Sequence, residues 1–142
     1  MTAERKKLIE NFKGLCRLAR VAELNERVDD WIGATSELSD EDARRILTQN
    51  AAVVLRRELF GLGVHWFDRN GATLKRMVAV LSVAQSARKI DPDCDGSFFD
   101  DLLSEHNELS DDDFVEVLTE WYERVEHNAG LILMETAEGR IQ

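Results

Sequence analysis

Apolar residues recur at spacings of three and four along most of the chain, which is the period of an amphipathic helix. The first such stripe consists of Leu8, Ile9, Phe12, Leu15, Cys16 and Ala19. It predicts a helix over about residues 3–22. A shorter helix should follow over residues 24–32 and end at Gly33, because glycine is common just after a helix. One proline and eight glycines leave few breaks, which favours helices over many short strands.

Three further helices are predicted to begin at Ser39, Thr73 and Ser110. A hydroxyl oxygen at the start of a helix accepts a hydrogen bond from a free backbone N–H, and the acidic residues that follow both serines suit the helix dipole. These helices should cover about residues 39–60, 73–91 and 110–133, with a short helix over 97–104 between the last two. The last helix has an apolar stripe made of Phe114, Val117, Leu118, Trp121 and Val125. The expected fold class is all-α: one compact domain over residues 1–142, built as a bundle of about five to seven helices.

The two halves of the chain resemble each other. Residues 28–49 align without gaps onto residues 99–120, an offset of 71, with nine identities in twenty-two positions. Two interpretations remain open. Two helices can share the same start signals, since serine followed by acidic residues is common at an N-terminus. Alternatively, a helical unit of about 70 residues has been duplicated, which predicts pseudo-symmetric halves over residues 1–71 and 72–142.

Charge is also distributed unevenly along the chain, and its sign changes near residue 90. Residues 91–142 contain sixteen acidic residues against two basic ones, whereas residues 1–89 contain sixteen basic residues against twelve acidic ones. The net charge of −10 disfavours a nucleic-acid partner. Residues 1–8 are charged and no long apolar stretch follows them, so we expect no signal peptide. No apolar run is long enough to span a membrane, and two cysteines make no disulfide framework. We therefore expect a cytoplasmic protein with reduced thiols and no membrane partner.

The acidic half predicts a binding surface on the last helix. Glu116, Glu120, Glu123 and His127 are spaced four, three and four apart, so they share one face, roughly opposite the apolar stripe. The predicted partner-binding residues are Asp112, Glu116, Glu120 and Glu123. At the 71-residue offset Glu116 corresponds to Arg45, so the same face is partly basic in the first half. This difference has three explanations: a contact with the basic face of the same or another copy, a basic external protein, or drift of a solvent-exposed face.

The predicted function is that of a non-enzymatic protein that binds a macromolecular partner, as an inhibitor, immunity protein, chaperone or adaptor does. No catalytic residue is predicted, because the three histidines have no nucleophile or acidic partner at a diagnostic spacing. A deep pocket that gathers His65 with distant carboxylates would favour an enzyme instead.

Weak calcium binding is the alternative prediction. Asp91, Asp93 and Asp95 precede Gly96 at the alternating positions of an EF-hand loop, which the segment resembles only in these few residues. The twelfth position, where the EF-hand needs a bidentate glutamate, is Leu102. The competing interpretation is an acidic turn in which Asp95 or Ser97 caps the following helix. No cofactor other than calcium is expected.

Overall fold

The computed structural model describes residues 1–71 and 73–137, and this part of the chain forms seven helices and no strand. The helices are α1 (Ala3–Ala19), α2 (Ala22–Ala34), α3 (Asp40–Gly61), α4 (Trp66–Arg69), α5 (Leu74–Ile90), α6 (Ser97–Glu105) and α7 (Asp111–Ala137). The all-α bundle of five to seven helices expected from the sequence is therefore confirmed.

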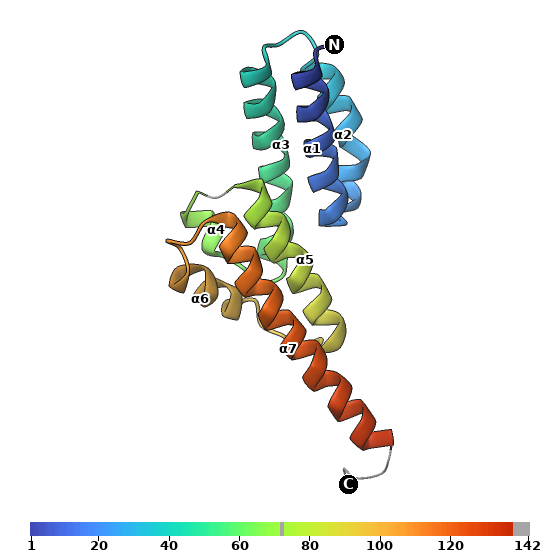
Figure 1. Ribbon diagram of the computed structural model, residues 1–142, viewed down its shortest axis with the longest axis vertical. Helices are drawn as coiled ribbons and strands as arrows, with labels where there is room; N and C mark the ends of the chain where they lie inside the picture. Colours follow the sequence, from blue (N-terminus) through green and yellow to red (C-terminus); the bar gives the residue numbers. More distant parts are fainter. Residues whose placement is uncertain (72, 138–142) are drawn as a thin grey trace.

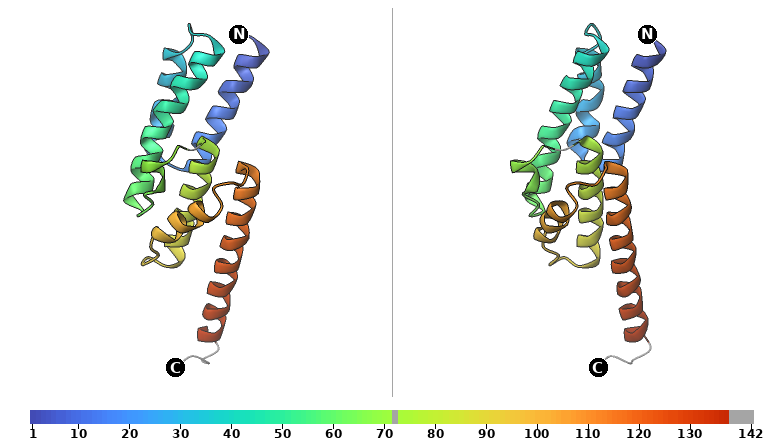
Figure 2. Two further views of the ribbon diagram at one scale, coloured as in Figure 1. Left: turned by 90° about the vertical axis from the view of Figure 1, so that its left-hand side faces the viewer. Right: turned by 60° about the vertical axis from the view of Figure 1, so that its left-hand side comes forward.

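The helices form an elongated bundle around one core. Helices α1, α2 and α3 pack side by side at one end, and α5 packs against both α1 and α3 (Figure 1). Helix α7 runs beside α5 and continues past its end, while the short α4 and α6 contact each other on one side (Figures 1 and 2). A single cluster of buried apolar side chains extends from Leu8 on α1 to Phe114 and Leu118 on α7. Of the predicted apolar stripe on α7, Val117, Trp121 and Val125 are only half-buried.

The predicted helix starts are confirmed by their caps. The Ser39 Oγ accepts a hydrogen bond from the Asp42 N–H at 3.2 Å, and Ser110 does the same for Asp113 at 3.2 Å. Thr73 accepts from the Arg76 N–H at 3.3 Å. These starts depend on a hydroxyl three residues away, which is why the sequence alone could locate them.

Three helix ends differ from the prediction. Helix α7 runs to Ala137, four residues past the predicted end at about 133. Helix α1 ends at Ala19 because Arg20 adopts a left-handed conformation with a φ of 55°. Gly33 is not the end of α2, since the helix runs through it to Ala34. The hydroxyl of the buried Thr35 donates to the carbonyls of Trp31 and Ile32 at 3.1 and 3.0 Å, and so satisfies acceptors of the last turn without a glycine.

The order of elements recurs at the 71-residue offset. Helices α1 and α5 have the same length and start at Ala3 and Leu74, and helices α3 and α7 start at Asp40 and Asp111. The middle elements differ, because α2 packs on α1 and α3 whereas the shorter α6 packs on α4. This spacing is what a duplication predicts, and duplication itself stays a hypothesis.

Gly96 and Gly63 bring two loops into backbone contact. Gly63, just after α3, has a φ of +85°, which favours glycine. A Cβ atom on Gly96 would lie 2.3 Å from the Leu62 carbonyl oxygen and 2.5 Å from the Gly63 carbonyl carbon. The turn after α3 therefore approaches the loop before α6 so closely that only glycine fits at position 96. This packing accounts for the glycine that resembled the sixth position of an EF-hand.

Candidate functional site

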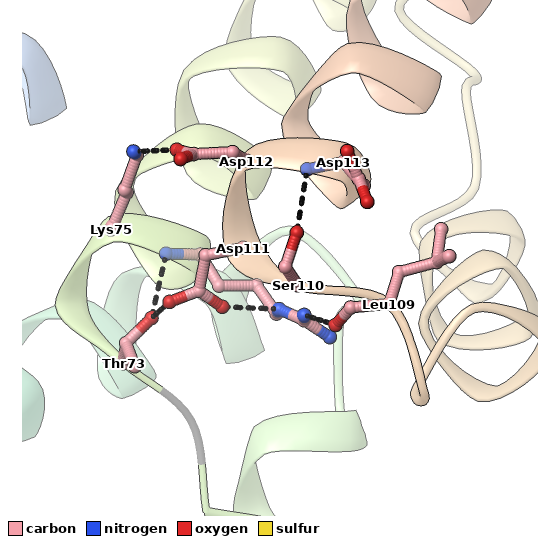
Figure 3. Close-up of polar contacts among 8 residues, drawn as sticks. Thr73, Lys75, Leu109, Ser110, Asp111, Asp112 and Asp113 are labelled. Atoms are coloured by element: carbon pink, nitrogen blue, oxygen red, sulfur yellow. Dashed lines mark hydrogen bonds and ion pairs between the residues drawn. The ribbon is translucent and has the colours of Figure 1, made fainter.

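The start of α7 is held against α5 by a buried arginine. Arg76 is 6% exposed; its Nε donates to Asp111 Oδ1 at 3.1 Å and its Nη2 donates to the Leu109 carbonyl at 2.8 Å. Its guanidinium carbon lies 4.6 Å from the centre of the Phe114 ring. The Thr73 hydroxyl adds a hydrogen bond of 2.6 Å to the other oxygen of Asp111 (Figure 3). Together these contacts fix where α7 begins and how it is rotated.

The first half contains the same arrangement. Arg5 on α1 donates from Nε to Asp40 Oδ1 at 2.7 Å, from Nη1 to the Thr35 carbonyl at 3.2 Å, and from Nη2 to the Leu38 carbonyl. Arg5 and Arg76, Asp40 and Asp111, and Leu38 and Leu109 are each 71 residues apart. Sequence reasoning missed both arginines. The repeated Thr-x-x-Arg at positions 2–5 and 73–76, in the same alignment register, could have revealed them.

The predicted partner-binding residues lie together on the outer face of α7. We call Asp112, Glu116, Glu120 and Glu123 the acidic stripe; all four are exposed. At 100° per residue they span an arc of about 80°, opposite the buried Phe114 and Leu118. None of the three glutamates forms an ion pair with another of the described residues. Their charges are therefore available to an external group.

Asp112 differs from the three glutamates because it has an intramolecular partner. Its carboxylate accepts a hydrogen bond from the Lys75 ammonium on α5 (Figure 3). This hydrogen bond and the charge of Asp112 raise the pKa of Lys75. The sequence could not show this pair, since the two residues belong to different helices. Asp112 therefore contributes less free charge to the acidic stripe than the glutamates do.

The distal part of the stripe borders an open hollow. It has a volume of about 480 Å³ and is lined by Glu120, Glu123, Arg124 and His127. Two carboxylates on its wall offer acceptors to a long basic side chain. The predicted apolar pattern of α7 continues toward Leu133, but the side chains beyond His127 lie outside the described residues.

The loop before α6 uses its carboxylates on its own backbone. Asp91 accepts a hydrogen bond from the Asp93 N–H at 3.1 Å, and Asp95 accepts one from the Ser97 N–H at 3.0 Å. The hydrogen bonds from Ser97 lower the pKa of Asp95. Among the side chains that the structure describes, those of residues 1–71 and 73–127, no group of three or more His, Cys, Asp or Glu is arranged to hold a metal ion. These contacts fit the acidic turn, and calcium binding by Asp91, Asp93 and Asp95 stays a prediction.

A groove of about 560 Å³ gathers His65 with a distant carboxylate, Asp100. The groove is lined by His65, Trp66, Arg69, Asn70, Asp100, Ser104 and Asn107. The Asp100 carboxylate accepts hydrogen bonds from the backbone N–H groups of His65 and Trp66, at 2.9 and 2.8 Å. It thus caps the start of α4, while the His65 ring packs edge-on against Phe60 with a centroid separation of 4.6 Å. Among the described residues, the Asp100 carboxylate receives hydrogen bonds from these backbone groups and none from the His65 ring.

The two cysteines lie in different environments and are expected to react at different rates. Burial raises the pKa of the Cys16 thiol to about 11, whereas Cys94 is half-buried and its pKa is raised by burial and by Asp91. The thiolate is the reacting species, so an aromatic disulfide reagent at pH 8 should modify Cys94 first and Cys16 only after unfolding. The Cys94→Ser variant should then show almost no reaction in the native state. Equal rates at both thiols would contradict the buried position of Cys16.

The chain matches no protein-family model, no curated protein and no solved structure. Its function must therefore be inferred from its own residues. None of the helices in the described part of the chain is both long enough and apolar enough to cross a membrane.

Proposed function

We propose that the protein is a non-enzymatic, cytoplasmic binding protein whose acidic stripe on α7 engages a basic protein. The observation that carries the proposal is the set of three exposed glutamates, Glu116, Glu120 and Glu123, which share one face and have no ion-pair partner among the described residues. An inhibitor, immunity protein, chaperone or adaptor can all use such a surface.

The energetics of α7 support this role. Like charges three or four residues apart destabilise a helix by about 0.2–0.5 kcal/mol per pair. Glu116 and Glu120, and Glu120 and Glu123, are such pairs. A basic partner relieves this repulsion when it binds. The negative field also steers a basic protein toward the surface and raises the association rate.

A small apolar surface formed by α6 and α7 can complete the contact. Phe98 on α6 is 38% exposed and stacks on Trp121 of α7, with ring centroids 4.6 Å apart and an interplanar angle of 24°. Trp121 lies about 100° around α7 from Glu120, so this surface adjoins only the edge of the acidic stripe. Aromatic side chains are enriched where proteins meet. We propose that electrostatic steering brings the partner to the stripe and that burial of a smaller apolar patch, for which Phe98 is the candidate, then stabilises the complex.

Charge reversal on the stripe tests this function. The wild-type protein is first used to capture its partner from the native cell at low salt, and the retained protein is identified. Substitution of Glu116, Glu120 and Glu123 by lysine should then weaken binding of that partner by at least about tenfold, because attraction becomes repulsion. Binding is measured by biolayer interferometry with each variant immobilised.

A matched variant controls for net charge. Glu26, Asp30 and Glu37 are exposed acidic residues of the first half that form no ion pair with the other described residues. Reversing these three to lysine changes the net charge by the same amount and should alter the dissociation constant by less than about twofold, since scattered exposed charges contribute little. Equal effects of the two triple variants would rule out the α7 stripe as the binding surface.

A further inference from the structure

Helix α3 presents an exposed stripe that is basic and partly apolar. Its members are Arg45, Gln49, Val53, Arg56 and Phe60, which we call the α3 stripe; all are exposed. They are spaced four, four, three and four residues apart, and so span an arc of about 80°. Val53 and Phe60 are 55% and 57% exposed, two turns apart on the same face. Exposed apolar residues aligned with arginines in this way have the composition of a protein-binding surface.

The two arginines of the α3 stripe, Arg45 and Arg56, form few ion pairs within the described part of the molecule. Among the described residues Arg45 pairs only with Asp42 on the preceding turn, at 3.1 Å, and both side chains are more than half exposed. Such exposed pairs contribute little to stability. Arg56 forms no ion pair with any of the described residues. Both guanidinium groups can therefore turn to an external carboxylate.

The α3 stripe and the acidic stripe share two corresponding positions on the corresponding helices α3 and α7. Arg45 corresponds to Glu116 and Gln49 to Glu120 at the 71-residue offset, counted from the capping serines Ser39 and Ser110. The other two acidic residues do not match, since Asp112 corresponds to Glu41 and Glu123 to the buried Ala52. Both stripes follow a spacing of four, four and three residues along their helices, in different registers; the α3 stripe carries arginines and the acidic stripe carries carboxylates. Within one molecule both α3 and α7 pack against α5, and no ion pair joins the two stripes among the described residues. A single chain thus carries two complementary surfaces that it does not itself bring together.

We propose that the α3 stripe of one copy docks on the acidic stripe of a second copy. This inference rests on the proposed function, because it uses the same glutamates and names one basic partner for them. The contact is head-to-tail, so each dimer retains one free stripe of each kind and can extend. Arg45 and Arg56 would face the glutamates, and Val53 and Phe60 would lose water in the contact.

The expected association is weak. From Arg45 to Phe60 the stripe is about 22 Å long at 1.5 Å per residue, so the contact is a single pair of helices. Such a contact is smaller than a standard interface of about 800 Å² per partner. Its ion pairs are exposed and are screened by salt. Self-association should therefore appear at high protein concentration and low ionic strength.

Sedimentation velocity of the full chain tests the inference. Between about 10 and 500 µM protein in 20 mM NaCl, the weight-average mass should rise above that of the monomer, and in 500 mM NaCl it should return to it. The R45E/R56E variant and the E116K/E123K variant should each raise the dissociation constant at least about tenfold. A chain with all four substitutions should associate again, because the charges have been exchanged between the stripes.

If the chain with all four substitutions associates again, the loss of association in the two double variants comes from a lost contact and not from unfolding. Circular dichroism of each variant checks the helix content. A protein that is monomeric throughout this range, association that neither reversal weakens, or a fourfold variant that fails to associate while folded would each overturn the inference. If the chain is monomeric yet binds its captured basic partner through Glu116, Glu120 and Glu123, self-docking is rejected and the proposed function stands.

Discussion

Replacement of Gly96 by alanine is expected to destabilise the fold by about 3 kcal/mol. The added methyl group would lie 2.3 Å from the Leu62 carbonyl oxygen and 2.5 Å from the Gly63 carbonyl carbon. Both are backbone atoms, and Gly63 itself has a φ that other residues rarely adopt. The two loops must therefore separate, and overpacking of a close contact costs about 1–3 kcal/mol or more. Urea unfolding followed by circular dichroism measures the change in the free energy of unfolding.

Gly14 provides the matched control for this substitution. It lies within α1, and a Cβ added to it would meet nothing within 4 Å. Alanine there should stabilise the protein by up to about 1 kcal/mol, because alanine is the better helix former. If the Gly96→Ala variant unfolds at the same urea concentration as Gly14→Ala, the loop before α6 does not lie as close to the backbone of Leu62 and Gly63 as in this structure.

Replacement of Arg76 by alanine is expected to cost about 2–3 kcal/mol in the free energy of unfolding. The side chain is buried, and its loss leaves the Leu109 carbonyl and the Asp111 carboxylate without their donors. Removing one partner of a buried, hydrogen-bonded pair is strongly destabilising, and the partial exposure of Asp111 reduces the cost here. The same substitution at Arg5 should have a similar effect, because Arg5 makes the equivalent contacts to Asp40 and Leu38.

Two further variants show which property of Arg76 stabilises the fold. Arg76→Lys keeps the charge but loses the planar fork, so it should recover less than half of the loss. Arg45→Ala removes an exposed arginine whose pair with Asp42 spans one turn, and should cost less than about 0.5 kcal/mol. If Arg76→Ala and Arg45→Ala lower the free energy of unfolding in urea by the same amount, the hydrogen bonds of the buried Arg76 do not stabilise the start of α7.

The helices and their starts could be predicted from the sequence because their signals are local. Ser39, Thr73 and Ser110 each cap a backbone N–H three residues away. The helix ends were less predictable. The end of α1 depends on the left-handed Arg20, and Thr35 satisfies the end of α2 where a glycine had been expected. Arginine and threonine are not typical stop signals, so the sequence pattern gave no indication of either.

The outward direction of Glu116, Glu120 and Glu123 could also be predicted, because helical periodicity alone determines it. The contacts that position these residues could not. Arg76 with Asp111 and Lys75 with Asp112 join residues more than thirty positions apart. In the sequence, Gly96 fits either the glycine of a calcium-binding loop or an acidic turn. The sequence could not show the actual requirement for glycine, because it arises from a loop that is distant in the chain.

The most direct test of the proposed binding surface is the association rate of the captured partner, measured by stopped flow between 20 and 500 mM NaCl. If the acidic stripe steers a basic protein, the rate for the wild-type chain should fall about tenfold or more across this range. The variant with lysine at Glu116, Glu120 and Glu123 should associate slowly at every salt concentration. A wild-type rate that does not change with salt and equals that of the variant would contradict the proposed function.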